Sequence, residues 1–122
     1  MIYYRFVESK TKLGIFRYLK DTDDIVFDEI YDTDVESYYK YEDIQMYLSD
    51  HLNKTKDIFK SHKIFYNIIR YHYFKSTARH LLYQMYKLKR LLKKFNISVD
   101  IISISDDNNI ILYEDHHQIV IC

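Results

Sequence analysis

The residues between positions 78 and 95 carry the pattern that most restricts how this chain can fold. Six apolar side chains recur there at steps of three and four residues: Ala78, Leu81, Met85, Leu88, Leu92 and Phe95. An α-helix has 3.6 residues per turn, so this spacing puts all six on one face. The sequence therefore predicts an amphipathic helix over 78–95 whose other face is basic and rich in tyrosine.

This helix belongs to a strongly basic block. Residues 51–98 hold twelve of the 18 Lys and Arg residues and one acid, Asp57, which gives a net charge of +11. The chain before the block has six basic and twelve acidic residues, and the chain after it has none and five. The overall charge of zero therefore hides an acidic, basic, acidic order, and the acidic flanks are able to neutralise the basic block if they fold against it.

A second helical pattern precedes the first, over 54–74. Its apolar face consists of Ile58, Phe65, Ile68 and Ile69, and Lys56, Lys60, Lys63 and Arg70 lie opposite. This stripe is out of phase with the one over 78–95, which favours a break near Ser76, where Ser or Thr is able to cap a new helix. The alternative is one continuous rod, about 60 Å long.

The first half of the chain predicts a strand, a hairpin and a helix. Residues 2–7 are β-branched and aromatic, as is typical of a strand. Apolar runs at 15–19 and 25–31 flank an Asp and Thr cluster, which predicts a hairpin, with a helical turn over 13–19 as the alternative. From Asp34 onward, Tyr41, Ile44, Leu48 and Leu52 follow a helical period, and Asp34 or Ser37 is positioned to cap that helix.

The last part of the chain predicts strands at 98–104, 110–113 and 119–122, separated by polar turns. We expect a β-meander in which the apolar stretches 101–104 and 119–122 occupy central or covered positions. The predicted fold is a single α+β domain over 1–122, with an antiparallel sheet from the N- and C-terminal strands and about three central helices packed on one face.

Several kinds of catalytic or cofactor site lack their residues here. One glycine excludes a glycine-rich phosphate loop, and Cys122 has no cysteine partner. His62, His72 and His80 lack the four-residue spacing of a helical zinc pair. We therefore predict a non-enzymatic protein without metal or cofactor. The alternative is a metal-independent ribonuclease, for which His72, His80 and Arg79 are the candidate residues.

The basic block is the candidate binding surface. Lys and Arg meet phosphates and aromatic rings stack on bases, so this composition favours nucleic acid or a host nucleoprotein complex. An acidic protein surface, a protein-only interaction module and an ordinary solvated helix face are the alternatives. The candidate residues are Lys56, Lys60, Lys63, Arg70, Arg79, Tyr83, Tyr86, Lys87, Arg90, Lys93 and Lys94.

The composition also suggests an origin. The chain has one Gly and no Pro, and 59 of its 122 residues are Phe, Tyr, Met, Ile, Asn or Lys, whose codons have A or T at both leading positions. Such a bias is typical of phages, large DNA viruses and mobile elements. No signal-peptide core and no apolar run long enough for a membrane are present. We expect an accessory protein in the host cytoplasm, away from membranes, that inhibits a host defence or takes over a host machine.

Overall fold

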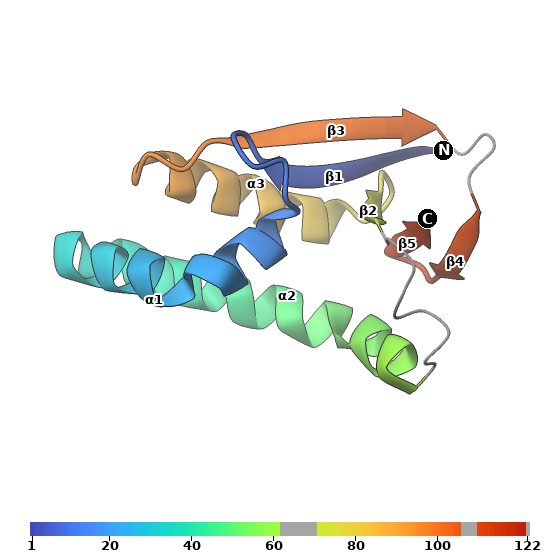
Figure 1. The fold of residues 1–122 in the computed structure, drawn as a ribbon, viewed down its shortest axis with the longest axis horizontal. Helices are drawn as coiled ribbons and strands as arrows, with labels where there is room; N and C mark the ends of the chain where they lie inside the picture. The colour runs from blue at the N-terminus through green and yellow to red at the C-terminus, as the bar shows by residue number, and fades with distance from the viewer. Residues whose placement is uncertain (62–70, 106–109, 122) are drawn as a thin grey trace.

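The computed structural model describes residues 1–61, 71–105 and 110–121, with the backbone alone at 23–24 and 53–61. The described elements are β1 (Ile2–Glu8), α1 (Ile15–Thr33), α2 (Val35–Ser61), β2 (Tyr71–Lys75), α3 (Arg79–Lys93), β3 (Val99–Ser105), β4 (Ile111–Glu114) and β5 (Gln118–Ile121). Figure 1 shows the three labelled helices on one side of β1 and β3. The predicted α+β class, with an antiparallel sheet and helices packed on one face, is confirmed.

The strands form one antiparallel sheet in the order β3-β1-β2-β5-β4. β1 pairs with β3 along its whole length, from Ile2 opposite Ser105 to Glu8 opposite Val99. The two ends of the chain therefore meet in one sheet, as predicted. The predicted meander is wrong, because β3 and β4 lie at opposite edges and β4 pairs with β5.

The two apolar C-terminal strands have different surroundings. All four residues of β5 are buried between β2 and β4, which confirms the prediction for 119–121, while Cys122 lies outside the described residues. β3 instead forms an edge of the described sheet, and Ile102 is 39% exposed, so the covered position predicted for 101–104 is wrong. The apolar residues of β3 are divided between the two faces of the sheet. Ile101 packs against the main core, and Ile104 packs against a small cluster that includes Tyr3.

Residues 15–33 form helix α1, so the predicted hairpin is wrong. The apolar residues Ile15, Leu19, Val26 and Ile30 are buried, and their spacing puts them on one helical face. The polar cluster that suggested a turn lies within this helix. Thr22 donates its hydroxyl hydrogen to the carbonyl of Tyr18, 2.8 Å away and one turn earlier, so its side chain is satisfied without a turn.

Helix α2 begins where the sequence predicts. The Oδ1 atom of Asp34 accepts hydrogen bonds from the backbone N–H groups of Glu36 (3.1 Å) and Ser37 (3.4 Å), which is an N-cap. The stripe predicted for this helix faces the core, with Tyr41, Ile44 and Leu48 buried and Leu52 packed against them. α2 continues to Ser61 and so includes the first part of the segment predicted as a separate helix over 54–74.

The end of that segment is strand β2, which corrects the helix prediction for 71–74. Pairing with distant strands determines this conformation, since Phe74 lies opposite Tyr4 of β1 and Tyr73 opposite Ile119 of β5. The predicted break near Ser76 is confirmed, but it separates a strand from α3. The predicted Ser or Thr cap is wrong, because the N-cap residue is Ala78 and no side chain caps α3.

Helix α3 agrees closely with its prediction. All six residues of the predicted stripe are buried, with at most 9% of each exposed. They pack in one core with apolar residues from the other layers, among them Phe6 of β1, Leu19 of α1 and Leu48 of α2. This packing fixes the rotation of α3 about its own axis, and so determines which of its side chains face outward.

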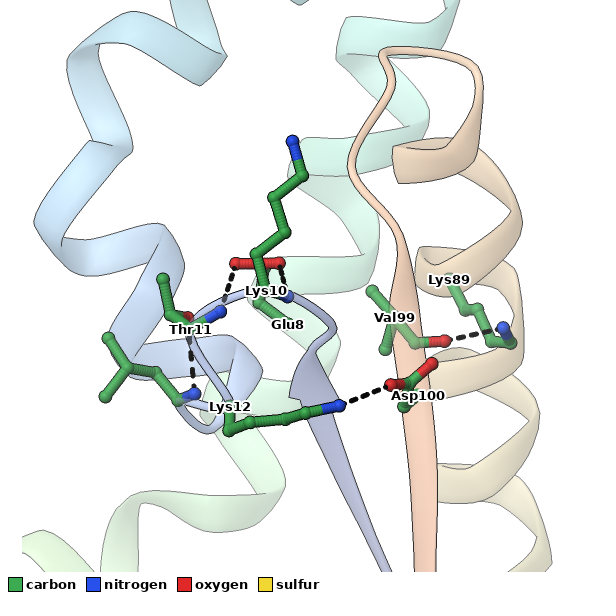
Figure 2. Close-up of polar contacts among 8 residues, drawn as sticks. Glu8, Lys10, Thr11, Lys12, Lys89, Val99 and Asp100 are labelled. Atoms are coloured by element: carbon green, nitrogen blue, oxygen red, sulfur yellow. Dashed lines mark hydrogen bonds and ion pairs between the residues drawn. The ribbon is translucent and has the colours of Figure 1, made fainter.

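A buried carboxylate organises the loop between β1 and α1. Glu8 is 4% exposed and accepts hydrogen bonds from the backbone N–H groups of Lys10 (2.6 Å) and Thr11 (3.0 Å), as Figure 2 shows. Burial by itself raises the pKa of Glu8, but these hydrogen bonds lower the pKa by more, so it lies below its usual value. The role of Glu8 is therefore structural.

Candidate nucleic-acid interface

The outward face of α3 is a row of basic and aromatic side chains. Its members follow a spacing of four, three, four and three residues, and each is exposed. They are Arg79, Tyr83, Tyr86, Arg90 and Lys93. Successive members lie about one helical turn apart, so the row runs along the helix for about 21 Å. We call these five residues the α3 row.

Two contacts hold α3 against the sheet beneath this row. The ammonium group of Lys89 donates a hydrogen bond to the carbonyl oxygen of Val99, 2.7 Å away, which joins α3 to β3 (Figure 2). The ring of Tyr86 meets the ring of Phe6 edge to face, with 5.7 Å between their centroids. The α3 row is therefore displayed on a helix that is fixed at both its buried stripe and its flank.

Tyr83 is the most exposed aromatic side chain of the row, with 59% of its surface accessible, compared with 41% for Tyr86. The ammonium group of Lys87 lies 5.3 Å from the centre of the Tyr83 ring, within the range of a cation–π contact. An exposed ring beside a positive charge can stack on a base while the charge meets the neighbouring phosphate.

The acidic residues that the structure describes form no ion pair with the α3 row. Ion pairs between described residues join Lys12 to Asp100 (3.0 Å) and Lys75 to Glu114 (2.6 Å), and neither involves α3. Arg79, Lys87, Arg90, Lys93 and Lys94 form no ion pair with a described acid. The pKa of Asp34 is below its usual value, mainly because Ser37 donates hydrogen bonds to its carboxylate. The nearby charge of Lys94 lowers the pKa of Asp34 a little further.

The other predicted basic side chains lie outside the described part of the chain. Lys56 and Lys60 lie on α2, where the structure describes their backbone and not their side chains. Lys63 and Arg70 also lie outside the described residues. The structure therefore brings together the seven candidates from Arg79 to Lys94, and a second basic face on residues 56–70 stays a prediction.

Three histidines from separate elements meet beside α3, and sequence reasoning missed this group. The ring centroids of His80 and His117 are 4.9 Å apart, those of His51 and His80 are 5.6 Å apart, and those of His51 and His117 are 6.3 Å apart. His51 lies on α2, His80 on α3 and His117 in the turn before β5. We call these three residues the histidine cluster.

No local signal could have revealed the histidine cluster, because 29 and 37 residues separate its members along the chain. The predicted candidates are arranged differently. His72 lies on β2 opposite Val120, while His62 lies outside the described residues. Of the ribonuclease candidates His72, His80 and Arg79, only His80 belongs to the cluster.

The surroundings of His117 disfavour its charged form. Burial lowers the pKa of the His117 ring, and the nearby His80 and His51 lower it further, whereas the carboxylate of Asp115 acts in the opposite direction. The net pKa is below the usual value for histidine, so the ring is mostly neutral near pH 7. The ring is then able to take up a proton when an anion approaches.

Within the described residues, no group of three His, Cys, Asp or Glu side chains is arranged to hold a metal ion. The described helices also include none that is long and apolar enough to cross a membrane. In comparisons with known proteins, no family model, no curated protein and no solved structure matches this chain. The physical features of the site are therefore the basis for a functional proposal.

Proposed function

We propose that this chain is a non-enzymatic accessory protein that binds host nucleic acid, free or within a nucleoprotein complex, through the outward face of α3. The observation that carries the proposal is the α3 row together with Lys87 and Lys94. These residues place five basic groups and two tyrosines on one helix, and no described acid forms an ion pair with those groups.

Each kind of side chain has a separate task in such a surface. Lys and Arg replace the counterions along a phosphate backbone, which supplies affinity without sequence preference. Exposed Tyr rings add stacking worth about 1–3 kcal/mol per base. Stacking needs bases that are free of a duplex, so the 59% exposure of Tyr83 favours a single-stranded ligand.

Direct binding measurements test this proposal. Labelled single-stranded DNA, single-stranded RNA and duplex DNA are titrated with the protein over a series of salt concentrations. We expect single strands to bind more tightly than the duplex, and the logarithm of affinity to fall linearly with the logarithm of salt concentration. Lack of binding to every oligonucleotide at low salt contradicts the proposal for free nucleic acid.

A nucleoprotein partner calls for a second measurement. The tagged protein is used to capture partners from an extract of the host, with and without nuclease treatment. We expect nuclease to release the captured material when nucleic acid is what α3 contacts. Material that stays bound after complete digestion supports the protein-only alternative instead.

A metal-independent ribonuclease is the second candidate, and the histidine cluster is the observation that favours it. General acid–base cleavage of RNA needs imidazole groups close together, and His51, His80 and His117 meet that requirement. Incubation with labelled RNA in the presence of a chelator tests this candidate. Intact RNA at high protein concentration rules it out and leaves the binding function.

A further inference from the structure

The histidine cluster lies at the N-terminal end of α3, where the α3 row begins. His80 directly follows Arg79, the first residue of that row. His80 is exposed, and His51 and His117 are half-buried, so the group lies at the surface. A ligand that follows the α3 row toward the start of the helix therefore meets these three rings.

His51 is held in a defined orientation. Its Nδ1 atom lies 2.8 Å from the carbonyl oxygen of Tyr47, and the two rings stack with 4.3 Å between their centroids. A carbonyl oxygen only accepts hydrogen bonds, so Nδ1 carries the hydrogen. The Nε2 atom is then the one that takes up a proton, and in the charged ring it becomes a hydrogen-bond donor.

His117 is held by a turn that is organised around Asp115. One carboxylate oxygen of Asp115 accepts from the backbone N–H groups of His117 (2.8 Å) and Gln118 (3.0 Å). The other accepts from the hydroxyl of Tyr113 (2.9 Å) and the side-chain amide of Gln118 (3.3 Å). Asp115 is therefore occupied by four donors, which fixes the turn and restricts its carboxylate from pairing with the imidazole.

Among the described residues around the cluster, Asp115 is the acid that acts on His117, and its oxygens already accept the hydrogen bonds given above. Facing His117 are His80 from α3, His51 from α2, and Asp115 and His116 from its own turn, while Tyr47 of α2 contacts the rings of His51 and His80. The neighbouring strands contribute Lys75 and Glu114, which neutralise each other at 2.6 Å. Like charges about 4–6 Å apart oppose one another, so full protonation of the three rings needs a negative partner from outside.

We propose that the histidine cluster is a proton-linked binding site for a phosphate group, and that it receives a backbone phosphate of the nucleic acid bound along the α3 row. That this phosphate comes from a nucleic acid rests on the function proposed above. Protonated rings would donate N–H hydrogen bonds to the phosphate oxygens, and the phosphate would offset their mutual repulsion.

Proton uptake gives this site a pH dependence of definite sign. A phosphate bound to the charged rings raises their proton affinity, so binding takes up protons and tightens as the pH falls through the histidine range. A phosphodiester keeps its single negative charge over this range, and a change in affinity therefore originates in the protein. Each proton taken up is worth at most tenfold in affinity per pH unit.

The first test uses inorganic phosphate and does not depend on nucleic acid. The ring signals of the histidines are followed by NMR through a pH titration, once in phosphate and once in chloride of the same ionic strength. We expect phosphate to raise the pKa of His117 by about half a unit or more, and to change the ring signals of the exposed His116 less. Identical titrations of the cluster in the two salts overturn the proposal.

The second test uses oligothymidylate and the double variant H80N/H117N, with H116N as the matched control on the same turn. We expect affinity of the unaltered protein and of H116N to rise about tenfold from about pH 8 to pH 5.5, and that of the double variant to change about twofold or less. Circular dichroism checks that each variant is folded.

The two tests separate this inference from the function on which it rests. If the double variant binds oligothymidylate with unchanged pH dependence, the binding role of the α3 row stands and the role of the histidine cluster is overturned. If inorganic phosphate raises the pKa of His117 but no oligonucleotide binds, the phosphate site stands and the nucleic-acid function is overturned. Loss of the pH dependence in the double variant alone supports both.

Discussion

Lys89 donates a hydrogen bond to the carbonyl of Val99 at 2.7 Å, and this bond ties α3 to the first residue of β3. Lys89 therefore differs in task from the basic side chains of the α3 row, because its ammonium group is engaged inside the fold. The difference lets structural and binding roles be separated by substitution within one helix.

Replacing Lys89 by Met should weaken the fold and leave binding nearly unchanged. The variant loses a charge-assisted hydrogen bond at a partly buried site, so we expect the free energy of unfolding to fall by about 1 kcal/mol. Oligonucleotide affinity should stay within about twofold, since the ammonium group of Lys89 is engaged with the carbonyl of Val99 and does not belong to the α3 row. Urea unfolding and anisotropy measure the two effects, and a large loss of affinity would assign Lys89 to the binding surface.

Tyr83 should show the opposite behaviour. We expect Tyr83→Ala to reduce single-strand affinity by about fivefold to a hundredfold, as loss of one stacked base implies. Stability should change by less than about 0.5 kcal/mol, because the side chain is 59% exposed. Tyr83→Phe is the matched control and should bind normally. If Phe is as poor as Ala, a hydrogen bond of the hydroxyl matters and stacking does not.

Leu88 tests whether the buried stripe of α3 holds the fold together. It is 1% exposed, so Leu88→Ala should leave a cavity and cost about 2–5 kcal/mol of unfolding free energy. Met46, which is 60% exposed on α2, provides the control, and Met46→Ala should cost less than about 0.5 kcal/mol. Similar losses in the two variants would mean that α3 does not pack as described.

Glu8 predicts how stability depends on acid. Its pKa is lowered in the folded protein, so its stabilisation is full above the unfolded pKa of about 4.3 and disappears as the pH falls through the folded value. Glu8→Gln should therefore be less stable than the unaltered protein at pH 7, and the two should converge in acid. Glu29→Gln, at an exposed position, is the control. Unfolding free energies of Glu8→Gln and the unaltered protein that differ by the same amount at every pH would contradict the role of Glu8.

The elements that the sequence predicts well are those whose pattern is local. The stripe from Ala78 to Phe95 places each of its residues in the core, and Asp34 caps α2 as expected. In α1 the same helical period is present at Ile15, Leu19 and Val26, but the Asp and Thr cluster over 20–24 is also typical of a turn, which favours a hairpin. The backbone of a helix is able to satisfy such side chains, as Thr22 does.

The features that the sequence could not predict depend on distant partners. Tyr73 and Phe74 lie in a strand because Ile119 and Tyr4 are opposite them, and the apolar spacing before them continued a helical period. The order of the strands and the meeting of His51 with His117 are set in the same way. A single sequence contains no spacing that records contacts across 66 residues.

The salt dependence of oligonucleotide binding by an α3 variant tests the central claim most directly. The triple variant R79Q/R90Q/K93Q is compared with R17Q/K20Q/K40Q, which removes the same charge from exposed positions on α1 and α2. If each removed group contacts a phosphate, the slope of log affinity against log salt for single strands should fall by about 2 in the α3 variant and stay near its original value in the control. Equal slopes in the two variants would contradict binding through the outward face of α3.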